Sequence, residues 1–579
     1  MVSVAAPRTA GVMRRRLVAP AGLLGGIPLL GLVTTVLLVP IAVFLSYSFR
    51  SSELFGVGDT YTLDSYREVV TSPEFRELML RSAVVAVIVA GIVVLCAFVL
   101  AYAITFRFGR WGNALLGVVL VSSLAAYIVR IYAWSSILGS NGLVNATLQA
   151  VGITDQPVVA LSYGYPAIVI TMVYLYLPVA ALIITANMSG IDRGQLEASA
   201  DLGGGRWRTV ASVVAPQTTR AVASAFALTA IIASADFVTP ALVGGPKGQM
   251  VGTTIQSAVL SRGDYPLGAA LGVATIVCTL ATLGLVLAAA RISASVAHRA
   301  AMAFRPAQRH RRRRIRTSLS APVAGALIAF LVAPLVVVVV FSLNTNRSVG
   351  LPMRGLTLSW YPAVLDEAGL IDSMANSLKL AVLTMLAALA IGVPAAFSLV
   401  RAQGWFRRVL WVAVLAPLVV PGVLIGAALL TAANDTGIRL GLGVTLAAQA
   451  LYAVPFVALI VRARILSIDD RLTESGRDLG STARRALRTV VFPLLLPSLA
   501  GGALLAASVA LDEILISTFT LGGDSTLPVW ILSRARRALT PGINAIAVMV
   551  LAVSLVSLVV ATRIASRVIS QRNSQAGTL

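Results

Sequence analysis

The chain has 579 residues, of which 58% are hydrophobic and 12% are charged. A soluble domain carries about 25% charged residues, so this composition excludes an ordinary soluble protein. The net charge of +23 would point to nucleic acid in a soluble chain, but apolar runs of about 20 residues, long enough to cross a bilayer, recur along the whole length. We therefore predict an all-α polytopic membrane protein with no nucleic-acid partner.

About twelve apolar segments are long enough to be membrane spans. In chain order they are 22–47, 82–106, 114–137, 165–187, 219–242, 268–290, 320–343, 374–399, 408–432, 443–463, 496–518 and 545–563. Arg14–Arg16 precede the first span, which is long and has no clear cleavage site, so we expect it to be retained and not to be a signal peptide. Arg130 lies in the third predicted span and Asp236 in the fifth.

The 46 lysines and arginines are unevenly distributed. Most lie in the N-terminal segment, the even-numbered loops, the linker after the sixth span and the C-terminal segment. The positive-inside rule then places both termini in the cytoplasm, in a multi-pass protein of the plasma or inner membrane. The run Arg309–Arg316 in the linker is interpreted as a contact with anionic membrane lipid and not as an RNA-binding tract.

An arginine-rich cytoplasmic linker at 291–319 divides the chain into the parts 1–290 and 320–579. Each part has six predicted spans, so each begins and ends in the cytoplasm. We therefore expect two parallel six-helix domains related by an axis along the membrane normal. The long outer loops 48–81 and 344–373 carry acidic and aromatic residues, and they are either contacts for an extracytoplasmic partner or plain solvated loops.

One polar signature occurs twice, at an offset of 277 residues (197 to 474). In each copy a glycine follows a glutamate after six positions, and a proline opens the next span. The residues of the two copies are Glu197, Ala198, Asp201, Gly203 and Pro216, and Glu474, Asp478, Gly480 and Pro493. Because each copy interrupts a very apolar chain, the repeat predicts two matched contact points on one side of the membrane.

The first copy predicts a helix–turn–helix elbow. Glu197–Ala200 favours a short helix, which the glycines Gly203–Gly205 end because glycine readily adopts the left-handed cap. A second amphipathic segment, Arg206–Val214, follows, and Pro216 can open the next span because a first-turn residue needs no N–H partner. The elbow has no nucleophile–base pair and no cluster of metal ligands, so we interpret it as a shape for a partner's groove.

The signature resembles the EAA loop of ATP-binding-cassette (ABC) importer permeases. The first copy has Ser199 in place of the second alanine and Ala215 in place of the usual leucine. The second copy departs further, with Ser475, Gly476 and Phe492 at the corresponding positions. The resemblance implies that coupling loops 191–216 and 468–493 each dock into one subunit of an ATPase dimer.

Further segments resemble the two permeases of spermidine/putrescine importers, joined head to tail. The segments are 130–134, 141–145 and 235–246 for the first permease, and 511–517, 525–528 and 541–545 for the second. The resemblance implies an importer permease for a small solute, with polyamines favoured, that receives its solute from an extracytoplasmic binding protein. Related permeases carry ferric iron, phosphonates or opines, and these remain alternatives.

The chain contains no G-x-x-x-x-G-K-[ST] motif, so it does not cradle ATP phosphates by that device. We expect a membrane-translocating subunit that is not itself an enzyme, with no cofactor or metal of its own and with ATP and Mg bound by a separate ATPase chain. A secondary transporter of the 6+6 type, driven by an ion gradient, fits the span count equally well. It gives no reason for two matched elbows.

Acidic residues lie inside two repeat-related spans. Asp236 corresponds, at the offset of 277, to Glu513, which follows Asp512. An ionisable group in mid-span costs roughly 2.5–3.5 kcal/mol, so it usually faces a cavity or the protein interior. We take these three acids as substrate-path candidates, although structural pairing, for example of Asp236 with Arg130, is an alternative.

Three aromatic residues complete the set of substrate-path candidates. Tyr132, Trp134 and Tyr174 lie in the third and fourth predicted spans and could add cation–π surface for an amine. The alternative is that they are core residues or members of an interfacial aromatic belt.

Overall fold

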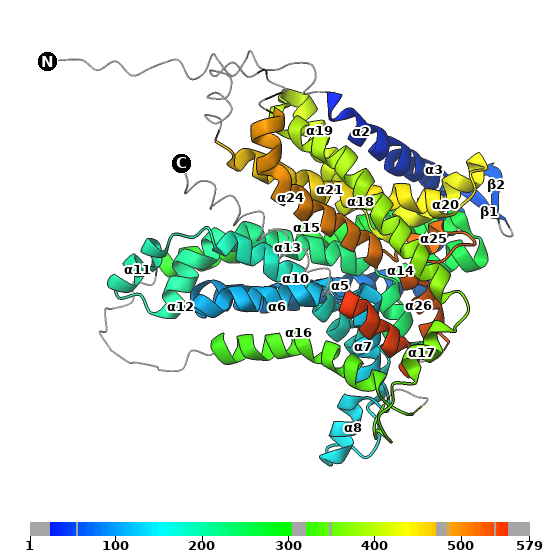
Figure 1. The fold of residues 1–579 in the computed structure, drawn as a ribbon, viewed down its shortest axis with the longest axis horizontal. Coiled ribbons are helices and arrows are strands. Elements are labelled where there is room, and N and C mark those ends of the chain that lie inside the picture. The colour runs from blue at the N-terminus through cyan, green and yellow to red at the C-terminus, as the bar shows by residue number, and fades with distance from the viewer. Residues whose placement is uncertain are drawn as a thin grey trace.

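The computed structural model describes residues 24–53, 56–303, 320–346, 350–469, 482, 485, 487–537 and 540–553. We call the elements up to α15 the first half and those from α16 onward the second half (Figure 1). The first half contains α2 (Ile27–Val33), η2 (Thr34–Leu38), α3 (Val39–Tyr47), β1 (Arg50–Glu53), β2 (Gly56–Tyr61), α4 (Asp64–Thr71), α5 (Pro73–Phe106), η3 (Gly109–Trp111), α6 (Gly112–Leu124), α7 (Tyr127–Leu138), α8 (Leu143–Ala150), α9 (Val159–Ser162), α10 (Tyr165–Met188), α11 (Arg193–Asp201), α12 (Arg206–Thr209), η4 (Val210–Val214), α13 (Ala215–Ser234), η5 (Pro240–Gly244), α14 (Val251–Ser257), η6 (Ala258–Arg262) and α15 (Tyr265–Ala303).

The second half repeats this order with fewer elements. It contains α16 (Ser320–Ser342), α17 (Trp360–Leu365), α18 (Leu370–Arg401), α19 (Gly404–Val419), α20 (Gly422–Thr436), α21 (Leu442–Ser467), η7 (Leu487–Val491), α24 (Phe492–Asp512), α25 (Ser517–Thr520), α26 (Leu527–Ala535) and a further helix over Pro541–Val553. The described strands, β1 and β2, form an antiparallel hairpin within the predicted loop 48–81, so the membrane part is all-α as predicted.

Eight described helices are long and apolar enough to cross a membrane, and the number rises to ten if each of two bent pairs is one span. The bent pairs are α6 with α7 and α19 with α20, which turn by 91° and 99° at the third and ninth predicted spans. The fifth predicted span, α13, is not among the eight, and the twelfth extends beyond the described residues. The total of twelve therefore stays a prediction.

Both bends have the same backbone cause. Ala125 and Ala126 have ψ angles of 131° and 137°, and Val420 and Pro421 have ψ angles of 125° and 137°. Two consecutive extended residues break the helical hydrogen-bond ladder, and in the second half Pro421 also lacks the N–H and disfavours a helical residue before it. Each pair therefore has a second helix that runs across the first.

The first span of each half packs against the other half. Leu29, Val33 and Leu37 belong to a core cluster otherwise formed by the second half, and α2 and α3 contact α18, α19, α20 and α21. In return, Leu331 of α16 lies in the core of the first half, where α16 contacts α5, α6 and α7. The backbones approach closely, since a Cβ on Gly25 would lie 2.8 Å from the carbonyl oxygen of Pro394. Neither half completes its core alone.

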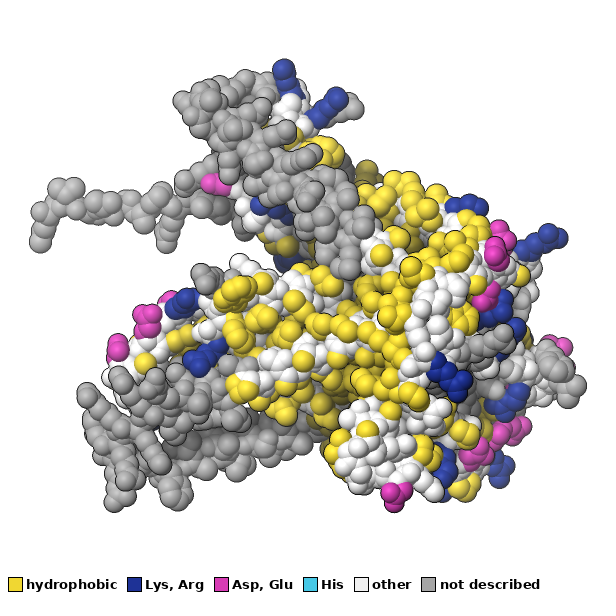
Figure 2. Space-filling model, turned by 60° about the horizontal axis from the view of Figure 1, so that its bottom comes forward, with side chains coloured by type: hydrophobic (Ala, Val, Ile, Leu, Met, Phe, Trp, Pro, Cys, Tyr) yellow, Lys and Arg dark blue, Asp and Glu magenta, His cyan; other side chains and the backbone are white. Residues whose placement is uncertain are grey.

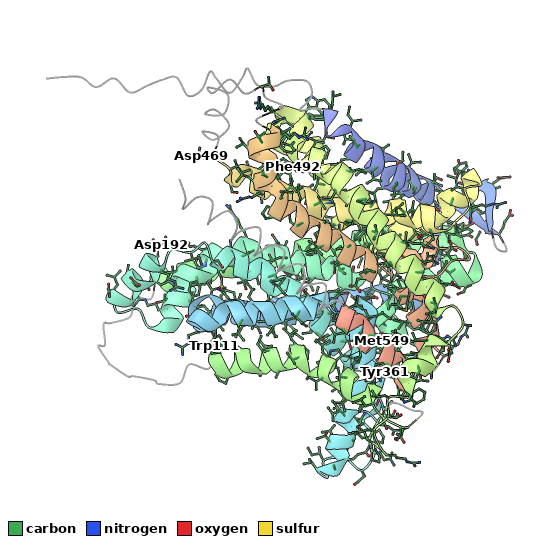
Figure 3. The ribbon with its side chains drawn as sticks, viewed as in Figure 1. Trp111, Asp192, Tyr361, Asp469, Phe492 and Met549 are labelled. Atoms are coloured by element: carbon green, nitrogen blue, oxygen red, sulfur yellow. The ribbon has the colours of Figure 1, made fainter. Side chains whose placement is uncertain are left out.

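The molecule has two arms that meet at one end and diverge at the other, with α2 and α3 in the arm of the second half and α16 in that of the first (Figure 1). Asp192 and Asp469, which the repeat relates, lie at the diverging ends of different arms, whereas Tyr361 and Met549 lie at the opposite end (Figure 3). Hydrophobic side chains cover the middle of the visible surface, and charged side chains gather toward its two ends (Figure 2). This distribution fits a protein that crosses a bilayer with the arms along the membrane normal.

Candidate functional site: an exposed elbow and a buried carboxylate network

The first elbow has the predicted helix–turn–helix form. Asp192 caps α11 by accepting a hydrogen bond from the Gly194 amide at 3.0 Å. The helix ends where Gly203 adopts a φ of +74°, in the left-handed region that glycine occupies without a Cβ clash. The chain then continues through α12 and η4 into α13, so the elbow is joined directly to a membrane helix.

The elbow is exposed. No residue of α11 is buried, so Glu197, Ala198 and Asp201 all present surface, and the apolar side chain of Leu202 is 87% exposed. Two polar contacts brace the elbow: Gln217 Nε2 donates to Gln195 Oε1 at 2.8 Å, and the hydroxyls of Ser199 and Thr209 lie 3.0 Å apart. The first elbow is therefore a braced helical turn with an exposed apolar residue at its tip.

Most of the second elbow lies outside the described residues, including Glu474, Asp478 and Gly480. Its exit is described and matches the first: five-residue π-helical turns, η4 and η7, precede Pro216 and Pro493 at the offset of 277. In η4 the Ala215 amide donates to the Val210 carbonyl, and the next residue, Pro216, has no N–H to restore the α-helical pattern. The sequence signature located both prolines but gave no signal for the π turns.

Asp236 lies in the short non-helical segment that follows α13, which we call the first helix break. Its side chain is buried, since the residue is 1% exposed. Its Oδ1 accepts hydrogen bonds from the Val238 and Thr239 amides at 2.9 and 3.2 Å. Its Oδ2 accepts from the hydroxyls of Thr239 at 2.5 Å, Tyr127 at 2.7 Å and Tyr176 at 3.3 Å. Five donors thus satisfy both oxygens, and the carboxylate stabilises the non-helical backbone at this helix break.

Glu513 performs the same task in the break after α24. Its Oε1 accepts from the Ile516 amide at 2.7 Å, and its Oε2 accepts from the Ser517 amide at 2.8 Å and the Ser517 hydroxyl at 2.6 Å. The amides that Glu513 caps lie three and four residues after it, whereas those that Asp236 caps lie two and three residues after it. The glutamate side chain is one methylene longer and so reaches one residue further. The repeat therefore conserves a capped break, with α25 following it as η5 follows Asp236.

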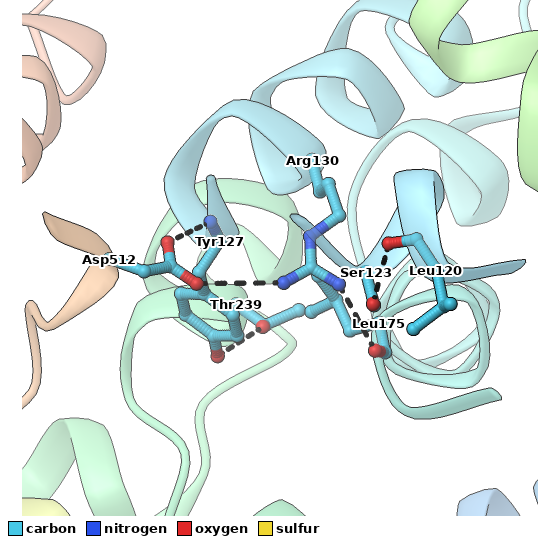
Figure 4. A network of polar contacts seen from close by, with 7 residues as sticks. All are labelled: Leu120, Ser123, Tyr127, Arg130, Leu175, Thr239 and Asp512. Carbon is cyan, nitrogen blue, oxygen red and sulfur yellow. Dashed lines mark hydrogen bonds and ion pairs between the residues drawn. The ribbon is translucent and has the colours of Figure 1, made fainter. Parts of the chain in front are cut away.

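Asp512 connects the two halves (Figure 4). Its Oδ1 accepts a hydrogen bond from the Tyr127 amide at the start of α7, and its Oδ2 lies 3.7 Å from Arg130 Nη2. The side chain of Asp512 is 30% exposed, whereas that of Arg130 is 7% exposed. Arg130 is thus paired with Asp512 and not with Asp236, the partner that the sequence suggested.

Tyr127 links the two acidic positions. Its amide donates to Asp512 of the second half, and its hydroxyl donates to Asp236 of the first. The sequence carries no signal for this role of Tyr127 or for that of Tyr176, because the partner of a hydroxyl depends on tertiary structure and leaves no local pattern.

The three aromatic candidates lie in packed contacts. The Tyr132 hydroxyl donates to the Thr540 carbonyl of the second half at 2.8 Å. Trp134 and Tyr174 pack on one another and on Phe330 of α16, with ring centroids 5.2 to 5.7 Å apart. Tyr132 and Tyr174 are fully buried and Trp134 is 7% exposed, so all three contribute to the junction of the halves.

Two separate segments of the chain, 73–302 and 388–572, match the family model described as "Binding-protein-dependent transport system inner membrane component". The matched segments cover most of the chain, and the first ends within the predicted linker 291–319. The chain therefore belongs to this family of membrane permeases, and it carries the family's domain twice.

Its relatives are single permeases that each match part of the chain. The Spermidine/putrescine transport system permease protein PotC of Escherichia coli (strain K12) is 30% identical over 247 residues, which are 42% of this chain and 91% of PotC. The Putrescine transport system permease protein PotI of the same strain is 31% identical over 38% of this chain and 82% of PotI. PotB, from the spermidine/putrescine system, is 27% identical over 37% of this chain and 77% of PotB.

A solved bacterial ABC transporter involved in the import of the acidic polysaccharide alginate aligns with a TM-score of 0.38 and 16% identity, over 46% of this chain and 93% of that one.

Proposed function

We propose that the chain is the fused translocating subunit of an ATP-driven importer, with both permease domains in one polypeptide. The observation that carries the proposal is the double match to the family of binding-protein-dependent permeases. The domains are 1–290 and 320–579, and the cytoplasmic linker 291–319 joins them. Both termini lie in the cytoplasm, and an extracytoplasmic binding protein delivers the solute to the outer face. Polyamines are the favoured solute class, since PotC and PotI bear polyamine names.

Loops 191–216 and 468–493 are the proposed docking points for an ATPase dimer, one subunit to each loop. The first loop supports this role by its exposed helix and by Leu202, whose side chain has no covering partner among the described residues. An apolar tip set among charged residues suits a groove on another protein. Glu197 and Glu474 hold equivalent places in the two loops.

The same helix connects the docking point to the buried acids. The elbow continues through η4 into α13, and the far end of α13 is the break that Asp236 caps. Closure of the ATPase would move the diverging ends of the arms together, and each rigid helix would carry that movement to the network around Asp512. The exposed carboxylate of Asp512 is the first candidate for solute contact, followed by Glu513.

The proposal is tested by uptake of labelled putrescine into proteoliposomes that contain the chain, its ATPase and its binding protein. We expect uptake to need ATP and to fall more than tenfold in the Glu197→Arg/Glu474→Arg double variant, because reversed charge disrupts both docking points. Asp155→Arg, at an exposed acid between α8 and α9, serves as the matched control and leaves uptake unchanged.

Two results would contradict the proposal. Normal uptake by the double variant would show that the loops do not couple the chain to an ATPase. Uptake that collapses with a protonophore while ATP stays high would favour transport driven by an ion gradient. Size-exclusion profiles of every variant ensure that a loss of uptake is not a loss of folding.

A further inference from the structure

Arg130 is a weakly held cation in a well-packed site. Every residue of α7 except Tyr127 is buried, and Arg130 is 6% exposed. Its Nη1 donates to the Leu175 carbonyl at a long 3.3 Å, its Nη2 lies 3.7 Å from Asp512 Oδ2, and its buried Nε has no hydrogen-bond partner. A guanidinium has five donors in a fixed fork, so this one uses few of them.

Asp512 is the acid with spare capacity. Both oxygens of Asp236 and both oxygens of Glu513 already accept hydrogen bonds within their own helix breaks. Asp512, by contrast, has an oxygen, Oδ2, whose recorded partner is the guanidinium at 3.7 Å, beyond hydrogen-bonding distance. Its side chain is also 30% exposed, so a solute can reach it while Arg130 stays buried.

The charges in the network are unequal. Three carboxylates lie at the two breaks, and Arg130 is the one cation that is paired with any of them among the described residues. With all three carboxylates ionised, the network has a formal excess of two negative charges, which is disfavoured without a further counter-cation. A solute with two ammonium groups matches that excess.

We propose that Arg130 is a resident counter-cation that occupies Asp512 when no solute is bound and yields it to a solute ammonium group. Arg130 therefore determines specificity in two ways. A solute cation must bind Asp512 more strongly than Arg130 does, and the positive charge of Arg130 fixes how much charge the solute must bring to neutralise the three acids. This inference rests on the proposed function, because it takes the solute to be a polyamine.

The test measures equilibrium binding of labelled putrescine and spermidine to the full chain with its ATPase in nanodiscs, without binding protein. Arg130→Gln removes the competing charge and keeps a donor for Leu175, so the Kd for putrescine falls about tenfold, the effect of roughly one partly desolvated ion pair. Arg130→Lys keeps the charge and the wild-type Kd. Asp512→Asn raises the Kd more than tenfold.

A second readout separates this role from a structural one. Arg130→Gln increases the formal negative excess from two to three, so its preference shifts several-fold from putrescine, a diamine, toward spermidine, a triamine. A residue that only braces α7 would not move that ratio. Lys379→Gln, a cation on the exposed face of α18, is the matched control and changes neither Kd nor preference.

The outcomes are distinguishable. An unchanged or higher putrescine Kd in Arg130→Gln, with Asp512→Asn still impaired, overturns the role of Arg130 and leaves the proposed function standing. If the wild-type chain binds no polyamine and Arg130→Gln abolishes binding of an anionic solute, both the polyamine assignment and this inference are wrong. Thermal unfolding of each variant excludes misfolding, and if Arg130→Gln fails to fold, Arg130→Met, which also removes the charge, takes its place with the same expected fall in Kd.

Discussion

The two helix breaks, after α13 and after α24, are capped in the same way but have different surroundings. Each is capped by a carboxylate at the offset of 277, yet Asp236 is 1% exposed and closed in by Tyr127 and Tyr176, whereas Glu513 adjoins a second acid that is 30% exposed. A duplicated domain has thus kept the cap that a broken helix needs in both copies. The second copy has in addition Asp512, a carboxylate that is partly exposed.

The largest expected loss of stability is at Asp236, in the buried helix break after α13. Asp236→Asn replaces the oxygen that accepts three hydroxyls with an amide that donates, so hydroxyl bonds to a charged acceptor are lost in a buried site. We expect the free energy of unfolding to fall by more than about 3 kcal/mol. Denaturation in mixed micelles of detergent and phospholipid measures this change.

Asp512→Asn is the matched control, because it makes the same isosteric change at the exposed carboxylate. Its amide oxygen can still accept from the Tyr127 N–H, and the ion pair it loses spans 3.7 Å. We expect a smaller loss than in Asp236→Asn, because the acid is partly exposed and the ion pair is already wide, even though Arg130 is left without its counter-charge. Equal losses in the two variants would show that the two positions do not differ in structural role.

The length of the capping side chain provides the next effect. Glu513→Asp shortens the side chain by one methylene, so the carboxylate no longer reaches the Ile516 and Ser517 amides together, which lie at 2.7 and 2.8 Å. We expect a loss of about 2 kcal/mol in unfolding free energy. Glu367→Asp, at the half-exposed pair with Arg534, should cost under about 0.5 kcal/mol. A neutral Glu513→Asp would mean that the break needs no cap.

The tyrosine that joins the two acids provides the smallest effect. Tyr127→Phe removes the 2.7 Å hydroxyl contact with Asp236 but keeps the amide bond to Asp512. We expect a stability loss of about 1 kcal/mol and an unchanged putrescine Kd. Tyr176→Phe, with its longer 3.3 Å contact, should lose less. A Kd that rises in Tyr127→Phe would place the solute at Asp236 and not at Asp512.

Local patterns predicted much of this molecule. The hydropathy runs located most membrane helices, the glycine and proline positions located the first elbow and its exit, and the repeat related Asp236 to Glu513. These features follow from residue chemistry within a few turns of chain. The double family match agrees with the expectation of two domains in one polypeptide.

Features set by tertiary packing were not predictable in the same way. The break at Ala125 and Ala126 has no proline or glycine, so its 91° bend leaves no sequence signal, and the apolar run simply continues through it. The exchange of first spans between halves also leaves none, because a lipid-facing and a partner-facing apolar helix look alike. The choice of Asp512 over Asp236 as the partner of Arg130 depends on how the halves meet.

The central claim is that this chain is a fused permease with two docking points for an ATPase. Quantitative mass spectrometry of what co-purifies with it from gently solubilised native membranes tests that claim most directly. The account predicts an ATPase at two copies per chain, lost in the Glu197→Arg/Glu474→Arg variant and kept in Asp155→Arg. Recovery of the chain without an ATPase, under conditions in which a known importer stays assembled, would contradict it.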